Sequence, residues 1–181
     1  AKGPEGQYAA YQAGQALYRA GQLEEASNRL RSFVARYSAS RLADDALFLV
    51  GWIEFQRCND ANAIEEFRKL LGAYPDGDHA VRALYTIADA QYNMGDIDAA
   101  ITTYQQVINR YPSEPLATEA ARSMQLALVG AGRTAEAIAI ADDLINANPT
   151  SPIAEEFAFK KAEIFYTGQN YTNAASELQA Y

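Results

Sequence analysis

The chain has 181 residues, of which 49% are hydrophobic and 21% charged, a composition typical of folded proteins. The net charge of -8 argues against binding of nucleic acid or anionic membranes through bulk electrostatics. The single cysteine excludes an intrachain disulfide and a cysteine-based zinc cluster, the single histidine excludes a polyhistidine metal site, and no apolar run approaches the roughly 20 residues that span a bilayer.

In chain order, residues 1–7 are expected to form a flexible segment or a cloning remnant, and a repeating pattern follows. Pro75, Pro112 and Pro149 lie 37 residues apart. The same interval separates a series of alanines, which are Ala26, Ala63, Ala100, Ala137 and Ala174. Self-similarity at a period of about 20–50 residues is typical of solenoids. The sequence therefore predicts a single solenoid over residues 8–181, with units at about 8–40, 41–77, 78–114, 115–151 and 152–181.

Each unit is predicted to contain two helices, so the expected fold class is all-α. In "AVRALYTIADAQYNM", residues 80–94, apolar side chains recur at helical spacing, and "IDAAITTYQQVINRY", residues 97–111, has a broad apolar face. Turn signals separate the helices of each unit, at residues 20–22, 58–60, 95–96, 131–133 and 168–170. Pro115 and Pro152 are expected to begin the first helices of the last two units, since proline is favoured in a first helical turn.

These residues resemble the tetratricopeptide repeat. Small residues occupy the middle of the first helix in four units, at Gly14, Gly51, Ala88 and Ala162, whereas Gln125 departs from this pattern. Glycine occupies the internal turn in three units, at Gly21, Gly95 and Gly132, whereas Cys58 and Gln169 depart. The second-helix pattern is matched by "AIEEF" at 63–67 and "AITTY" at 100–104. The resemblance covers residues 8–181 and implies a right-handed superhelical solenoid of about five helix–turn–helix units.

The length of the repeat points to one branch of that family. The usual period is 34 residues, whereas this chain keeps 37, and the excess falls between one unit and the next. This spacing looks like that of bacterial cell-envelope members, which include the outer-membrane lipoprotein of β-barrel assembly and the periplasmic coordinator of the Tol–Pal system. The resemblance implies a periplasmic or cell-envelope location, with a cytoplasmic one as the alternative.

No catalytic, cofactor or metal site is predicted, and the chain is not expected to be an enzyme. Adjacent carboxylates such as Asp44 and Asp45 point about 100° apart on a helix, so they do not converge on one atom. "PDGDH" at 75–79 lacks the ligand spacing of a calcium loop and is interpreted as a turn with Asp78 as helix N-cap. Cys58 is interpreted as a buried structural thiol in a turn.

The candidate site is a concave groove lined by the first helices, as the family resemblance implies. Aromatic and arginine residues, which are enriched at binding hot spots, occupy its expected positions. The candidates are Tyr11, Tyr18, Phe48, Trp52, Phe55, Arg82, Tyr85, Tyr92, Arg122, Phe159 and Tyr166. The alternative, that these aromatics pack between repeats rather than bind, is open at this stage.

The sequence therefore predicts a non-enzymatic scaffold that binds a protein or peptide, without nucleic acid, cofactor or metal. The fifth unit is expected to stop within its second helix, which suggests a piece of a longer protein or a naturally short last helix. Two other functions are considered. One is a structural spacer that self-associates, and the other is the docking arm of an enzyme whose catalytic domain lies elsewhere.

Overall fold

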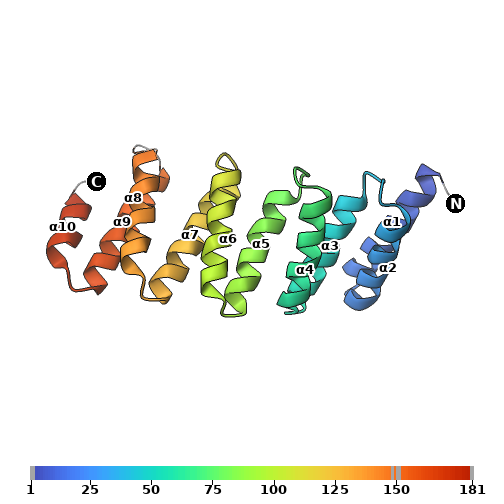
Figure 1. The fold of residues 1–181 in the computed structure, drawn as a ribbon, viewed down its shortest axis with the longest axis horizontal. Helices are drawn as coiled ribbons and strands as arrows, with labels where there is room; N and C mark the ends of the chain where they lie inside the picture. The colour runs from blue at the N-terminus through green and yellow to red at the C-terminus, as the bar shows by residue number, and fades with distance from the viewer. Residues whose placement is uncertain (1–2, 148, 150–151, 180–181) are drawn as a thin grey trace. The chain divides into compact units, whose positions relative to one another are not determined.

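The computed structural model of the protein describes residues 3–147, 149 and 152–179, and its regular structure in these ranges is entirely α-helical. The helices are α1 (Pro4–Arg19), α2 (Leu23–Arg36), α3 (Ala43–Gln56), α4 (Asp60–Ala73), α5 (Ala80–Asn93), α6 (Ile97–Arg110), α7 (Pro115–Gly130), α8 (Thr134–Ala147), α9 (Pro152–Thr167) and α10 (Tyr171–Gln179) (Figure 1). Among them, none combines the length and the apolar character needed to cross a bilayer.

The chain divides into two compact units, residues 1–99 (unit 1) and 100–181 (unit 2), with the division inside α6. In unit 1, each helix from α1 to α4 packs against the one that follows it, and consecutive helices run in opposite directions (Figure 1). In unit 2, α7, α8, α9 and α10 pack in the same sequential way. The predicted fold, an all-α solenoid of helix–turn–helix repeats, is confirmed, while the handedness of its superhelix stays a prediction.

The helix ends agree with most of the sequence signals. Helix α1 begins at Pro4, so residues 4–7, which were assigned to an N-terminal segment, are helical; proline at the first helical position explains this start. Helices α7 and α9 begin at Pro115 and Pro152 as predicted, whereas Ser151 lies outside the described residues. The prediction of Asp78 as an N-cap is wrong. His79 occupies that position, because α5 starts only at Ala80.

The turn within each unit uses a left-handed backbone. Three of these turns have glycine with φ between +74° and +79°, and the other two have Cys58 and Gln169 with φ of +58° and +60°. The backbone N–H of Cys58 donates to the Phe55 carbonyl, and that of Gln169 donates to the Tyr166 carbonyl, so both turns close in the same way. Cys58 is exposed, and the prediction of a buried thiol is wrong because this turn position faces solvent.

Size complementarity holds the two helices of a repeat together. A Cβ atom added to Gly51 would lie 2.7 Å from the Phe67 ring, and one added to Gly14 would lie 2.7 Å from a Leu30 methyl group. The five alanines spaced 37 residues apart are all buried. In the fourth repeat the sizes are reversed, because Gln125 stands at the first-helix position and Ala141 at the second. Gln125 is buried, and its side-chain amide donates to the Ala137 carbonyl at 3.3 Å.

Candidate protein-binding surface

The first helices of the repeats, α1, α3 and α5 in unit 1 and α7 and α9 in unit 2, carry the predicted groove residues. We call the surface of these helices the first-helix face of each unit. The structure places the predicted residues of unit 1 in two classes, buried and partly exposed. In unit 2, both predicted aromatic residues, Phe159 and Tyr166, are exposed.

Two predicted binding residues in unit 1 are core side chains. Tyr11 is 7% exposed, and its ring packs against Phe33 of α2 at a centroid distance of 5.8 Å. Burial raises the pKa of Tyr11 to about 12, with the charge of Asp45 adding to the effect. Phe48 is 9% exposed and contacts Phe67 of α4 at 5.6 Å. The packing alternative therefore describes these two residues, which leave little surface for a partner.

The ring of Phe48 is also covered on its other sides. His79 stacks on it at a centroid distance of 4.4 Å and bonds through Nε2 to Asp45 Oδ1 at 2.7 Å. The Arg82 guanidinium lies 5.9 Å from the same ring, and Trp52 stacks beside it at 6.3 Å. The stacking of His79 on Phe48 could not be predicted from the sequence, because the two residues are 31 positions apart in the chain.

The remaining aromatic candidates of unit 1 keep part of their surface accessible. Trp52 and Phe55 pack together at 5.7 Å and are both half-buried, as are Tyr18 and Tyr85. Tyr92, near the end of α5, is exposed. The first-helix face of unit 1 thus presents the edges of aromatic rings whose neighbours anchor them in the core.

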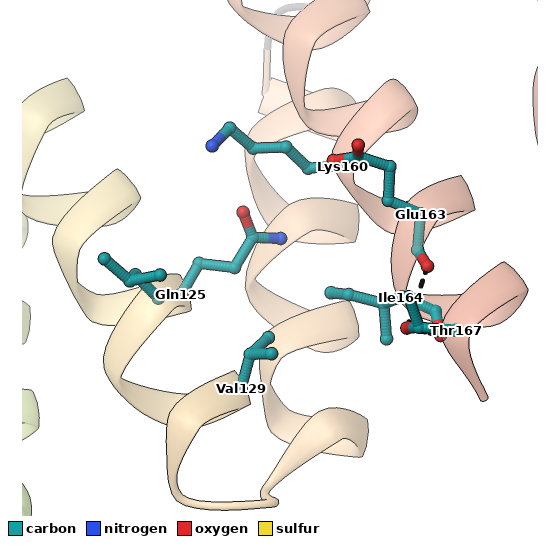
Figure 2. Close-up of a pocket in the computed structure, with 7 residues that line it drawn as sticks. Gln125, Val129, Lys160, Glu163, Ile164 and Thr167 are labelled. Carbon is teal, nitrogen blue, oxygen red and sulfur yellow. Dashed lines mark hydrogen bonds between the residues drawn. The ribbon is translucent and has the colours of Figure 1, made fainter.

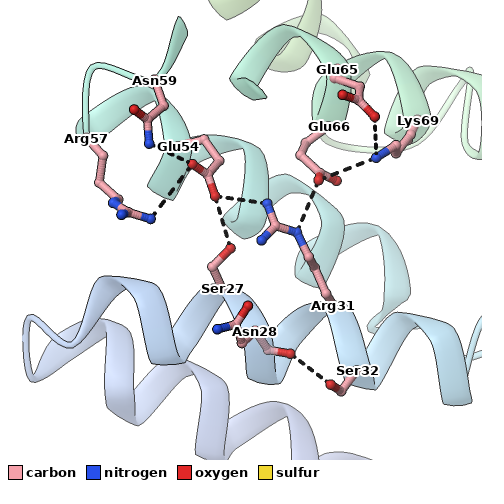
Figure 3. Close-up of polar contacts among 10 residues, drawn as sticks. All are labelled: Ser27, Asn28, Arg31, Ser32, Glu54, Arg57, Asn59, Glu65, Glu66 and Lys69. Carbon is pink, nitrogen blue, oxygen red and sulfur yellow. Dashed lines mark hydrogen bonds and ion pairs between the residues drawn. The ribbon is translucent and has the colours of Figure 1, made fainter. Parts of the chain in front are cut away.

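A largely buried ion cluster joins the first two repeats of unit 1 (Figure 3). Arg31 of α2 donates from Nη2 to Glu54 Oε1 at 2.9 Å and from Nε to Glu66 Oε1 at 3.1 Å. The Glu54 side chain is only 4% exposed and also accepts hydrogen bonds from Ser27 and Asn59. Burial alone would raise the pKa of Glu54, but the hydrogen bonds from Asn59 and Arg31 and nearby positive charge hold it below its usual value. The two buried glutamates of the cluster are therefore paired within the protein and are poor candidates for contact with a partner.

In unit 2 the predicted arginine is engaged within the protein. Arg122 of α7 donates from Nε to Glu156 Oε1 of α9 at 2.8 Å and also contacts Glu119. The hydrogen bond to Glu156 raises the pKa of Arg122 above its usual value, and the same bond lowers the pKa of Glu156. Arg122 therefore fixes α7 against α9 and is a poor candidate for the main contact with a partner.

A pocket of about 300 Å³ opens between α7 and α9, and we call it the α7–α9 pocket. Figure 2 shows Gln125 and Val129 of α7 facing Ile164 of α9, while Lys160 reaches from α9 towards α7. Leu126, Glu163 and Thr167 complete the lining. The Thr167 hydroxyl donates to the Glu163 carbonyl at 3.0 Å. The walls are thus mostly apolar, with one carboxylate and one ammonium group among them.

The first helices of unit 2 carry several exposed large apolar side chains. Leu126 is 64% and Phe159 is 57% exposed, and Val129 and Tyr166 are exposed as well. Aromatic residues with large exposed areas are favourable contacts for a protein partner. Phe159 and Tyr166 were predicted as binding candidates, and the structure exposes both.

None of the predicted candidates lines the α7–α9 pocket as the described residues define it. Sequence reasoning that favoured aromatics and arginine passed over Leu126, Val129 and Ile164. The repeat register contained the signal, since Val129 stands 37 residues after Tyr92. The smaller Val129 at a position where other repeats have an aromatic residue is the sequence feature that indicates the α7–α9 pocket. Within the described chain, no group of three or more His, Cys, Asp or Glu side chains is placed to hold a metal ion.

Repeated helix pairs with an open, mostly apolar pocket between first helices define a helical-repeat protein. Sequence models of the family described as tetratricopeptide repeat match residues 11–78, 82–113 and 125–181. The chain therefore belongs to the tetratricopeptide repeat family. Comparison with curated proteins finds no match to this sequence.

Several solved structures share the fold. A tetratricopeptide repeat protein from Parabacteroides merdae is 16% identical with a TM-score of 0.72, over 97% of this chain and 65% of its own. MamA from Desulfovibrio magneticus RS-1 is 16% identical with a TM-score of 0.68, over 99% of this chain and 94% of its own. The pilF protein of Pseudomonas aeruginosa is 19% identical with a TM-score of 0.62, over 96% of this chain and 73% of its own. At these identities the similarity establishes the fold alone.

Proposed function

We propose that this protein is a non-enzymatic scaffold that binds a segment of a partner protein on the first-helix face of unit 2. The α7–α9 pocket carries the proposal, because it offers an apolar recess of about 300 Å³ between two helices that both pack against α8 and are joined by the Arg122–Glu156 ion pair. A preformed recess reduces the ordering cost of binding. Leu126 lines this recess, and Phe159 is a further exposed apolar side chain of α9.

The first-helix face of unit 1 contributes less to this function. Its best-placed rings, Tyr11 and Phe48, are committed to the core, so a partner would meet mainly Trp52, Phe55 and Tyr92. The ion cluster of Arg31 is likewise satisfied internally. Unit 1 therefore acts first as a rigid support and second as a binding surface.

The test compares one doubly substituted and one singly substituted protein with the wild type. Proteins retained by the immobilised chain are identified, and the affinity of each purified partner is measured by isothermal titration calorimetry. Leu126→Ser with Phe159→Ser should weaken binding by more than about tenfold, because both exposed side chains lose apolar contact area. The matched control is Leu178→Ser, which changes an equally exposed side chain on the second helix α10.

Three results decide the matter. Loss of affinity in the first-helix variant alone supports the proposal. Equal loss in Leu178→Ser, or no loss in either protein, overturns it. Concentration-dependent sedimentation of the wild type that the double variant leaves unchanged would instead support the self-associating spacer.

A bacterial cell-envelope location is part of the same proposal. It rests on the 37-residue spacing of Pro75, Pro112 and Pro149, which lengthens each unit at its boundary. Fractionation of cells that express the parent gene with an epitope tag tests it. Recovery in the periplasmic or membrane fraction is expected, and recovery only with cytoplasmic markers overturns it.

A further inference from the structure

A second pocket adjoins the α7–α9 pocket in unit 2. It has a volume of about 400 Å³ and lies between the start of α8 and the end of α9, and we call it the α8–α9 pocket. Thr134, Ala135 and Ile138 line it from α8, and Phe165 lines it from α9. Ile164 and Thr167 line both pockets. The two recesses are therefore neighbours that meet at the last turn of α9.

The two shared lining residues define a path from one pocket to the other. A segment seated in the α7–α9 pocket reaches the α8–α9 pocket by crossing Ile164 and Thr167, close to the turn between α9 and α10. Ile138 and Phe165 make the second recess apolar, and its lining among the described residues includes no charged side chain. Both recesses thus suit apolar side chains from one chain segment.

The charges around this path favour a positively charged partner segment. Lys160 Nζ lies 3.9 Å from Glu156 Oε1, and Arg122 pairs with both Glu156 and Glu119, so two carboxylates of the protein face these two cations. The Glu163 carboxylate lines the α7–α9 pocket, is exposed, and has no ion-pair partner among the described residues. The chain as a whole carries a net charge of -8. The local and overall charges are therefore complementary to a cation.

We propose that the two pockets bind one continuous basic segment of a partner protein. One apolar side chain of the segment fills each pocket, and a lysine or arginine between them pairs with Glu163. This inference rests on the proposed function and adds the path and the chemistry of the ligand. A second copy of this chain fits the surface poorly, because its own net charge of -8 opposes close approach.

The probes are short fluorescein-labelled peptides whose binding is followed by fluorescence anisotropy. Each basic peptide has two leucines separated by one, two or three lysines between Ser-Gly ends. Because an extended chain spans about 3.3 Å per residue, these spacers cover leucine separations of about 7–13 Å. Matched acidic peptides have glutamate for lysine, and single-anchor peptides have serine for one leucine.

The expected results separate the anchors from the charge. With the wild type, at least one basic peptide should bind about tenfold more tightly than its single-anchor counterpart, because a second leucine is buried. The same peptide should bind several-fold more tightly than its acidic counterpart, and this preference should shrink when salt is raised.

Two variants assign these effects to the structure. Ile138→Ser in the α8–α9 pocket should remove the gain from the second leucine and leave single-anchor binding unchanged. Glu163→Gln should reduce the preference for basic over acidic peptides by about threefold, since it removes one exposed charge pair. Glu155→Gln is the matched control, because it removes an equal charge from an exposed position of α9 outside both pockets.

Each contrary outcome overturns the inference. Acidic peptides that bind as well as basic ones, a second leucine that adds nothing, or binding by no probe would each do so. Equal effects of Glu163→Gln and Glu155→Gln would show a general charge effect without a specific pair. The proposed function fails separately, when Leu126→Ser with Phe159→Ser leaves the affinity for a purified protein partner unchanged.

Discussion

The two units use the same repeat pattern to build different interiors. In unit 1, large side chains such as Phe33, Phe48 and Phe67 form the core, and Arg31 bridges two buried glutamates. In unit 2, most of the buried apolar residues are alanines, with Phe157 and Tyr104 buried among them, whereas Phe159 is exposed. Phe48 and Phe159 occupy equivalent repeat positions but differ in burial, and Phe159 lies in the last repeat of this sequence.

The difference has a physical origin in the neighbouring helices. Phe48 is enclosed because Phe67 from α4 and His79 before α5 both meet its ring. No ring contact of this kind involves Phe159 among the described residues, and its side chain is left in solvent. Phe48 is thus enclosed by its own repeat and by the next one, whereas Phe159 lies in the last repeat of this sequence, where the position equivalent to Phe67 is the exposed Leu178.

The largest expected effect comes from truncating these two equivalent phenylalanines. Phe48→Ala should lower the free energy of unfolding by about 3–5 kcal/mol, because it leaves a cavity beside Phe67. Phe159→Ala should change it by less than about 0.5 kcal/mol, because the ring is exposed. Urea denaturation followed by far-UV circular dichroism measures both. Trp52, the only tryptophan, stacks on Phe48 and reports unit 1 by fluorescence. Similar losses in the two variants would contradict the contrast between the units.

The sequence predicted the fold more fully than the site. The interval of 37 residues was enough to identify the repeats, because a solenoid repeats its contacts between near neighbours in the chain. The burial of Phe48 depends on side chains about 19 to 31 residues away in the chain, Phe67 and His79. Those contacts are set by the packing of neighbouring helices, which cannot be deduced from the apolar periodicity of a single helix.

The α7–α9 pocket illustrates the same limit. It depends on Gln125 and Val129 of α7 and on Ile164 of α9, which lie some 35 residues apart in the chain. The departure at Gln125 was visible in the sequence, but its consequence was not. In the structure the long side chain is accommodated in the fourth repeat, which has the small Ala141 on its second helix, and it forms one wall of the pocket.

The next effect tests how closely the helices of unit 1 approach each other. Gly51→Ala should destabilise the protein by about 1–3 kcal/mol, because the new Cβ would lie 2.7 Å from the fully buried Phe67 ring. Gly72→Ala is the matched control within the same unit. That glycine is in α4 with no atom within 4 Å of an added Cβ, so a gain of about 0.5 kcal/mol is expected. Urea denaturation measures both, and equal effects would show that the close approach is not required.

The ion cluster of unit 1 is expected to have a smaller, pH-dependent effect. Arg31→Met should cost about 1–2 kcal/mol near neutral pH, since Glu54 stays buried but keeps its bonds to Ser27 and Asn59. The folded protein holds the pKa of Glu54 below its usual value, so the unfolded chain binds the proton more readily. This contribution is complete above about pH 4.3, the usual glutamate pKa, and is lost as pH falls through the lower folded-state pKa.

The difference between wild type and Arg31→Met should therefore shrink as the pH is lowered below about 4. Arg133→Met provides the comparison in unit 2, where Arg133 pairs with the exposed Glu136 at 2.7 Å. Its cost at neutral pH should stay below about 0.5 kcal/mol. Urea titrations at pH values from about 3 to 7 measure both differences. A pH-independent cost of Arg31→Met would show that lost packing, rather than the buried carboxylate, explains its effect.

The smallest expected effect tests whether the turns add to the contrast between the units. Cys58 in unit 1 and Gln169 in unit 2 both adopt a positive φ that costs an ordinary residue about 1 kcal/mol. Cys58→Gly and Gln169→Gly should each stabilise the protein by roughly 0.5 kcal/mol. Glycine removes the cost of the positive φ in the folded protein, but part of this gain is lost because glycine also gives the unfolded chain more freedom. Hydrogen-exchange mass spectrometry localises each gain to its own unit. Equal gains would place the difference between the units in their cores. A larger gain for Gln169→Gly would instead show that strain at the α9–α10 turn weakens unit 2.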